Sequence, residues 1–332
     1  MIAMPATSPC ACGRIDVHAH FMPECYTEAL AQHGLGQSDG GFPFPAWSAD
    51  AAIATMDRLE IATAMISVSS PSVNFLPVTE RPALCRAVNL AGRQLAATHA
   101  GRFGYFASLP LPDIDAALKE IAFAFDELGA DGIVLETNIN GEYLGSPRFA
   151  PIFAELNHRA AVLFVHPTSP VCTGDLMAGR PAPLLEFPFD TTRSFVDLLY
   201  RRVIQSNPEI KFIVPHAGGA LSALAARIAS FANVPFIEPR PSSDVEVFDT
   251  LRRLYYDLAL STHPSALTAL RGIAPLDHIL FGSDWPFAAE ANVAHALTQL
   301  LQENGLDDGQ IRALTRGNAE ALFPRLVSRT VS

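Results

Sequence analysis

The stretch Asp16-Val17-His18-Ala19-His20 places two histidines one residue apart, at the end of an apolar run near the N-terminus. The run predicts a β-strand, and side chains two residues apart on a strand point to the same face, about 6.6 Å apart along it. Two imidazoles on one face can bind a single metal ion, although the same pair also occurs on exposed strands. Later segments of the chain decide between these interpretations.

The rest of the chain alternates short apolar runs, which predict strands, with amphipathic stretches, which predict helices. This alternation is typical of βα units around a parallel sheet. Eight such units in 332 residues predict an α/β fold, a single distorted (β/α)8 TIM barrel. The expected strands are 14–18, 62–67, 102–108, 132–136, 161–166, 211–216, 254–258 and 278–281. The expected helices are 50–59, 81–98, 113–128, 147–159, 191–206, 221–229 and 264–271, with Asp50, Asp113 and Asp190 as N-caps.

We expect the barrel to cover residues 14–326, with a tail at 1–13 and another at 327–332. Two connections are too long for simple turns: 21–49 after the first strand and 167–189 after the fifth. Long loops in a compact domain are usually functional, and the loops that follow barrel strands form the catalytic face.

Composition excludes several classes of partner. The net charge is −11, with 34 acidic and 23 basic residues and no basic run, so nucleic acid is not expected. The five cysteines are scattered and odd in number, which favours a reducing cytoplasm over a disulfide framework. The first nine residues do not read as a signal peptide, and no apolar segment approaches the ~18 residues of a membrane span. An anionic substrate would need individually placed cations in such an acidic protein, which draws attention to single arginines.

Five polar side chains sit where predicted strands end: His18, His20, His166, His216 and Asp284. Each has a simpler explanation alone, as a satisfied turn histidine or a helix cap. In a barrel, however, the carboxyl ends of the strands converge at the catalytic face. Three imidazoles and a carboxylate suit a divalent metal, Zn²⁺ first and Mn²⁺ as the alternative. The remaining histidine, His216, would transfer a proton or orient the substrate.

The motifs together resemble the amidohydrolase superfamily, and within it the metal-dependent, non-oxidative decarboxylases. That branch includes aminocarboxymuconate-semialdehyde, γ-resorcylate and 6-methylsalicylate decarboxylases. The motifs are Asp16-Val-His-Ala-His20, His166-Pro167, His216-Ala-Gly-Gly219, Gly282-Ser-Asp-Trp-Pro286 and Gly317-Asn-Ala-Glu-Ala-Leu-Phe323.

The resemblance implies that His18, His20, His166 and Asp284 bind one divalent metal and that His216 is the catalytic histidine. It also implies a homodimer or homotetramer in which Arg227 reaches the neighbouring subunit's active site.

The lysines indicate how many metals to expect. Binuclear members of the superfamily commonly bridge two metals with a carboxylated lysine. The two lysines here, Lys119 in a predicted helix and Lys211 at the start of a predicted strand, are misplaced for this role. Glu136, at the end of the fourth strand, could bridge a second metal, but a contact to a helix or loop is favoured. We therefore expect a mononuclear site.

The predicted activity is decarboxylation of a small aromatic carboxylic acid of the salicylate type, with 6-methylsalicylate as the leading candidate. Asp284 would donate or relay the proton to the ring carbon, and His216 would stabilise charge on the oxygen. Flat side chains could sandwich the ring, and a guanidinium could pair with the carboxylate. The predicted substrate-binding residues are Trp47, Phe189, Trp285, Arg193 and Arg227.

Two alternatives stay open at this point. A hydrolase or hydratase, for example a lactonase that acts on a ring-cleavage product, would use nearly the same ligands. A non-catalytic barrel that binds a metal or an aromatic acid as a sensor would also carry them, since a fold does not prove a function.

Overall fold

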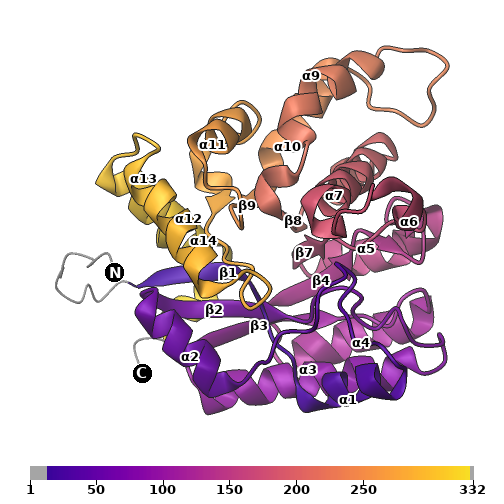
Figure 1. Cartoon of the computed structure of the whole chain (residues 1–332). Helices are drawn as coiled ribbons and strands as arrows, with labels where there is room; N and C mark the ends of the chain where they lie inside the picture. The colour runs from indigo at the N-terminus through magenta and orange to yellow at the C-terminus, as the bar shows by residue number, and fades with distance from the viewer. Residues whose placement is uncertain (1–12, 330–332) are drawn as a thin grey trace.

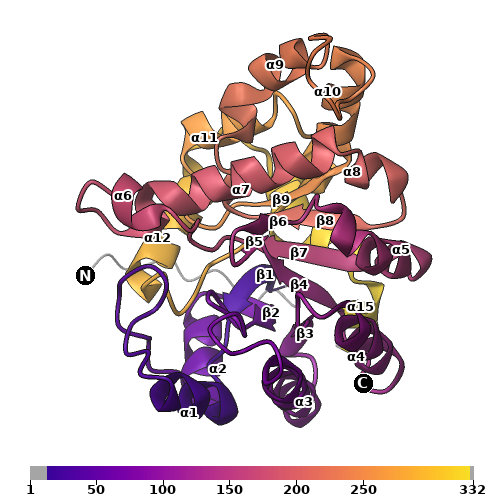
Figure 2. The ribbon, with the colours of Figure 1, turned by 90° about the vertical axis from the view of Figure 1, so that its right-hand side faces the viewer.

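The computed structural model describes residues 13–329, and its strands form a parallel barrel enclosed by helices (Figures 1 and 2). The eight strands pair in chain order, which confirms the predicted (β/α)8 barrel. They are β1 (Arg14–His20), β2 (Ile61–Ser67), β3 (Phe103–Ser108), β4 (Gly132–Glu136), β7 (Val162–His166), β8 (Lys211–Val214), β9 (Tyr255–Asp257) and β10 (Ile279–Leu280).

The barrel is closed where β1 meets the segment after β10. The backbone N–H of Val17 donates to the carbonyl of Phe281 (2.9 Å), and that of His20 donates to the carbonyl of Trp285 (2.8 Å). The N–H of Asp284 donates to the carbonyl of His18 (2.7 Å). These bonds hold the Asp284 segment directly beside the histidine pair.

A β-bulge in β1 aims the histidine pair into the barrel. Four residues of β1, from Asp16 to Ala19, lie opposite only three of β2, from Ala64 to Ile66. Ile15, before the bulge, and Val17, within it, belong to the apolar cluster that contains Phe164. His18 lies within the bulge too, and its ring packs edge-on against the Phe164 ring, with 4.8 Å between the centroids. Bulges of this kind redirect side chains next to active sites.

The helices form the outer layer, with α1–α4 on one side of the barrel and α9–α11 on the opposite side (Figures 1 and 2). The main ones are α2 (Ala49–Arg58), α3 (Arg81–Thr98), α4 (Ile114–Asp126), α5 (Ala150–His158), α7 (Ala182–Tyr200), α9 (Leu221–Phe231), α10 (Asp244–Arg253), α11 (Pro264–Leu270) and α12 (Glu290–Gln302). The remaining ones are α1 (Glu24–Gln32), α6 (Thr173–Leu176), α8 (Val203–Ser206), α13 (Asp308–Arg312), α14 (Asn318–Leu322) and α15 (Pro324–Arg329). A small hairpin, β5 (Asn138–Ile139) and β6 (Glu142–Tyr143), follows β4.

The two long connections are partly helical, contrary to expectation. The first contains α1, and the second contains α6 and the first half of α7. The helix predicted to start at residue 191 begins at Ala182. The earlier start was not predicted because Pro188, which lies inside the helix, normally ends or breaks a helix. The hydroxyl of Thr192 donates to the carbonyl of Pro188 (2.8 Å), which gives that carbonyl a side-chain partner within the helix.

Two of the three predicted N-caps are wrong. Asp113 caps α4 as predicted and accepts from the N–H of Ala116 (3.0 Å). The cap of α2 is Ser48, and Asp50 lies inside its first turn. Asp190 is buried within α7 and accepts from the hydroxyl of Tyr143 (2.5 Å).

The predicted tails are only partly described. Most of 1–13 lies outside the described residues. At the other end, α15 continues as far as Arg329, inside the segment expected as the second tail. Within the described part of the chain, no helix is long and apolar enough to cross a membrane.

Candidate active site

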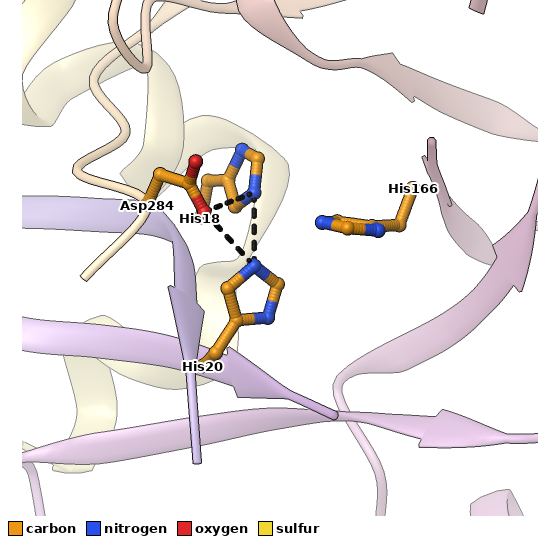
Figure 3. A group of neighbouring side chains, drawn as sticks. All are labelled: His18, His20, His166 and Asp284. Atoms are coloured by element: carbon orange, nitrogen blue, oxygen red, sulfur yellow. Dashed lines mark hydrogen bonds and ion pairs between the residues drawn. The ribbon is translucent and has the colours of Figure 1, made fainter. Parts of the chain in front are cut away.

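The structure brings His18, His20, His166 and Asp284 together at the carboxyl ends of the strands (Figure 3). One potential ligand atom from each of the four lies within 4.8 Å of the others. The three histidines are buried, and Asp284 is partly buried. This grouping is the one predicted for the metal ligands.

The partners of His18 and His20 determine which ring nitrogen carries the hydrogen. Nδ1 of His20 lies 3.2 Å from the carbonyl of Ser67, and a carbonyl only accepts, so this Nδ1 is the donor. Nδ1 of His18 lies 3.0 Å from Oδ2 of Asp257 and donates to that carboxylate in the same way. In its neutral form, each ring therefore presents the lone pair of Nε2 to the site.

Three acceptors then face one another. The Nε2 atoms of His18 and His20 are 3.2 Å apart. Oδ1 of Asp284 lies 3.2 Å from Nε2 of His20 and 3.5 Å from Nε2 of His18. Acceptors this close repel unless a cation lies between them. The donor set of neutral imidazoles and one carboxylate therefore fits a divalent metal.

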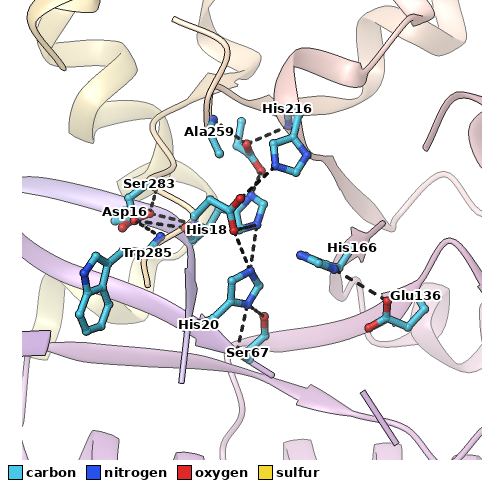
Figure 4. A network of polar contacts seen from close by, with 12 residues as sticks. Asp16, His18, His20, Ser67, Glu136, His166, His216, Ala259, Ser283 and Trp285 are labelled. Atoms are coloured by element: carbon cyan, nitrogen blue, oxygen red, sulfur yellow. Dashed lines mark hydrogen bonds and ion pairs between the residues drawn. The ribbon is translucent and has the colours of Figure 1, made fainter. Parts of the chain in front are cut away.

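His166 completes the set from the opposite side of the site. Its Nδ1 lies 3.8 Å from Oε2 of Glu136, and the other edge of its ring points toward the remaining three side chains (Figures 3 and 4). Burial, followed by the charges of His20 and His18, lowers the pKa of His166 well below its usual value, so the imidazole is neutral. Burial likewise raises the pKa of Glu136 well above its usual value. Glu136 lies on the Nδ1 side of His166 and is not part of the group formed by His18, His20, His166 and Asp284.

The electrostatic potential at the site is negative, because buried carboxylates surround His18. Burial lowers the pKa of His18, but Asp257 and Asp284 outweigh it and raise this pKa to about 9. Burial opposes ionisation of Asp284, yet His20, His216 and His18 hold its pKa well below the usual range. In the absence of metal these charges retain a second proton on His18, and a metal cation that binds to Nε2 takes the place of this proton.

Asp257 and Asp16 support the site from behind and were missed by the sequence analysis as functional residues. Oδ1 of Asp257 accepts from the backbone N–H of His216 (3.1 Å) while Oδ2 holds His18. Oδ1 of Asp16 accepts from the N–H groups of His18 and Ser283, each at 3.0 Å (Figure 4). Asp257 is the last residue of β9, the same signal that singled out the predicted metal ligands, whereas Asp16 is the third residue of β1.

His216 lies beside the four predicted metal ligands. Its Nε2 is 3.5 Å from Oδ2 of Asp284, whereas His18 and His20 face the other carboxylate oxygen. His216 and Asp284 both have left-handed backbone conformations, with φ of 53° and 60°. Such residues cluster at functional sites.

The glycine pair after His216 has a structural reason. Gly219 has φ +60°, and a Cβ there would lie 2.3 Å from the carbonyl oxygen of Pro188. The motif therefore lets the His216 segment approach α7 closely.

A cavity of about 520 Å³ opens above the site. His166, His216 and Asp284 form its floor, and Phe187 and Phe287 lie close to the metal ligands. The Phe287 ring is 5.4 Å from that of His20, and the Phe187 ring is 6.5 Å from that of His166, centroid to centroid. The cavity can accommodate an aromatic ring against the floor.

None of the five predicted substrate-binding residues lines this cavity. Trp47 and Trp285 line a separate small apolar pocket. Phe189 lies on α7 two residues after Phe187, and residues two apart on a helix do not share a face, so only Phe187 reaches the cavity. This segment was expected to be a loop.

The two arginines have other partners within the chain. Arg193 lies 3.7 Å from both Glu186 and Asp190. Arg227 lies on the exposed face of α9, with its guanidinium 5.1 Å from the ring centroid of Phe231. An approach of Arg227 to another subunit stays a prediction.

With this geometry established, comparison with known proteins decides the family. The chain matches the family described as amidohydrolase over residues 15–325. The chain belongs to the amidohydrolase family. This amidohydrolase is 36% identical over 319 residues to the 6-methylsalicylic acid decarboxylase of Penicillium expansum, with 94% of this chain and 97% of that protein covered.

Solved structures agree with the fold. A crystal structure described as amidohydrolase II matches with a TM-score of 0.86 at 34% identity and covers 94% of this chain and 99% of its own. A dihydroxybenzoic acid decarboxylase from Polaromonas sp. JS666, crystallised with manganese and 2-nitroresorcinol, has a TM-score of 0.79 at 22% identity, with 94% and 97% covered. The predicted resemblance is confirmed, and the group of three histidines and one aspartate suits one divalent metal.

Proposed function

We propose that this amidohydrolase is a metal-dependent decarboxylase of a salicylate-type aromatic acid. The observation that carries the proposal is the position of Asp284. Its Oδ1 faces His18 and His20, and its Oδ2 faces His216, at the floor of a cavity with aromatic walls. The sequence identity of 36% to a 6-methylsalicylic acid decarboxylase, over 94% of this chain, supports this class of substrate.

The cofactor in this proposal is one divalent ion per chain, Zn²⁺ or Mn²⁺, held by His18, His20, His166 and Asp284. When bound, the metal acts as a Lewis acid and a template for the carboxylate and ortho hydroxyl of the substrate.

The reaction requires a proton at the ring carbon that bears the carboxylate. The C–C bond then breaks, its electron pair returns to the ring, and CO₂ leaves. Asp284 and His216 share one proton across the 3.5 Å between Oδ2 and Nε2, and Asp284 delivers it to the ring carbon. A carboxyl with a strongly lowered pKa is a strong acid once protonated, which suits a weakly basic carbon. His216 then restores the proton from solvent and stabilises charge on the substrate oxygen.

We also propose a homodimer or homotetramer in the cytoplasm. Among the described residues no arginine or lysine lines the cavity, so a cation for the substrate carboxylate would come from Arg227 of a second subunit. The exposed guanidinium of Arg227 supports this. Cys25, Cys85 and Cys172 are free thiols, which supports a reducing compartment.

The test uses the protein loaded with Zn²⁺ or Mn²⁺ and 6-methylsalicylate in D₂O. We expect CO₂ and 3-methylphenol with one deuterium at the carbon that carried the carboxylate. Hydrolysis of lactones without CO₂ release would identify the lactonase-like alternative. Tight binding of the acid with no turnover would identify the non-catalytic barrel.

A further inference from the structure

The lining of the cavity combines ionisable side chains on its floor with apolar side chains at its opening, and four serines (Ser38, Ser69, Ser70 and Ser261) also line it. The ionisable residues that line it, His166, His216 and Asp284, all lie on the floor. The opening is surrounded by exposed apolar side chains, with Leu184 at 60%, Leu260 at 54% and Phe42 at 48% exposure. Single exposed leucines are ordinary, but large apolar side chains that converge on one opening are typical of a ligand-binding surface.

The cavity is larger than a one-ring acid needs. Its volume of about 520 Å³ lies within the range of cavities that hold drug-sized ligands, roughly 300–1,000 Å³. A salicylate whose carboxylate lies on the floor, with its ring near Phe187 and Phe287, leaves the outer part of the cavity unfilled. The outer part offers no charged partner from the described residues of this chain.

The apolar opening is built before any ligand arrives. Phe42 belongs to the connection after β1, Leu184 to the first turn of α7 and Leu260 to the segment after β9. A Cβ on Gly40 would lie 2.7 Å from Cγ of Pro183, so the connection packs directly on the start of α7.

The carboxylate of Asp39 holds the same connection to two neighbouring loops. Its Oδ2 accepts from the hydroxyls of Ser70 (2.7 Å) and Thr168 (2.9 Å) and from the N–H of Ser169 (2.6 Å). Walls held in this way lose little conformational freedom when an apolar group binds.

We propose that the preferred substrates are salicylate-type acids that carry an extended, uncharged apolar substituent longer than a methyl group. The acid group lies on the floor, and the substituent lies among Phe42, Leu184 and Leu260. This inference rests on the proposed decarboxylase function and names its substrate class.

The test compares 6-alkylsalicylates from methyl to heptyl with the metal-loaded enzyme. We expect kcat/KM to rise about fourfold per methylene until the opening is reached, which is the ~0.8 kcal/mol of a buried CH₂ converted at about 1.4 kcal/mol per tenfold. A terminal carboxylate on the longest chain should remove the gain. A flat or falling series, or full retention of the gain with the charged chain, overturns the inference.

A matched pair of variants locates the substituent. Leu184→Ser should lower the ratio of kcat/KM for heptyl over methyl at least tenfold. Leu185→Ser changes the next residue of α7, which is 49% exposed but does not line the cavity, and should keep the ratio. Equal ratios in the two variants would overturn the placement.

Binding of the corresponding 3-alkylphenols, measured by calorimetry, separates this inference from the proposed function. Their Kd should fall with chain length in wild type and in Leu185→Ser, but much less in Leu184→Ser. If Kd falls in this way while no acid of the series releases CO₂, the proposed function fails and the apolar site stands. If the methyl compound is decarboxylated and neither kcat/KM nor Kd depends on chain length, the proposed function stands and the inference fails.

Discussion

Asp257→Asn tests whether the tautomer of His18 controls metal binding. Oδ1 of Asp257 accepts from the N–H groups of His216 (3.1 Å) and Ala259 (2.9 Å), so the oxygen of the new amide stays on that side. The amide NH₂ then replaces Oδ2 and points at Nδ1 of His18, 3.0 Å away. Two donors cannot face each other, so His18 must move its hydrogen to Nε2 and lose the lone pair that faces the metal site.

Loss of a carboxylate that orients a metal-binding histidine typically costs 10–100-fold in metal affinity, or about 1.4–2.7 kcal/mol. We expect this loss for Zn²⁺ and Mn²⁺ in competition titrations with a chromophoric chelator. The control is Asp16→Asn, also buried in the site, because Oδ1 of Asp16 accepts from the backbone N–H groups of His18 and Ser283, and the amide oxygen of asparagine can take its place. Unchanged metal affinity in Asp257→Asn, or an equal loss in Asp16→Asn, would refute the role assigned to the tautomer.

Three further predictions concern catalysis, assembly and pH. His216→Ala should retain the metal and lose about 10²–10⁴-fold in kcat, measured as CO₂ release; loss of metal would instead make His216 a ligand. Arg227→Ala should chiefly raise KM, and sedimentation should show at least a dimer; a fully active monomer would exclude a role across subunits. In the metal-free protein, the folded-state pKa of His18 near 9 exceeds its unfolded value of 6.5, so its contribution to stability is complete below pH 6.5 and disappears as the pH rises through 9. Urea unfolding should show a loss on the order of 3 kcal/mol across this range, and a His18→Asn variant with the same pH profile would contradict it.

The grouping of His18, His20, His166 and Asp284 was predictable from sequence, because the strands of a parallel barrel bring their carboxyl ends together and a polar residue after an apolar run then lies at that end. Asp257 carries the same signal and was overlooked because it lies within the predicted strand 254–258. The sequence analysis also did not predict α10, although its sequence contains a start signal. Ser243 and Glu246 have the spacing of a capping box, and the N–H of Glu246 donates to the Ser243 hydroxyl (3.2 Å).

The wall of the cavity was not predictable in the same way. Whether Phe187 or Phe189 faces the substrate depends on the helical phase of α7, and Pro188 between them made this segment look like a loop. Trp285 follows Asp284 directly and Trp47 lies in the connection after β1, but the directions of both side chains depend on packing between distant segments. The sequence shows which residues are aromatic, but only the tertiary structure determines which of these side chains line the cavity.

The hydrogen bond from Ser283 to Asp16 joins residues 267 positions apart. This bond and its neighbours close the barrel, and His20 and Asp284 lie on either side of the closure. A metal held by both would act as a reversible cross-link between the first and last βα units. Binding would then be possible only after the C-terminal units have folded, and the amides of His20 and Asp284 should gain the greatest protection from hydrogen exchange when metal is added.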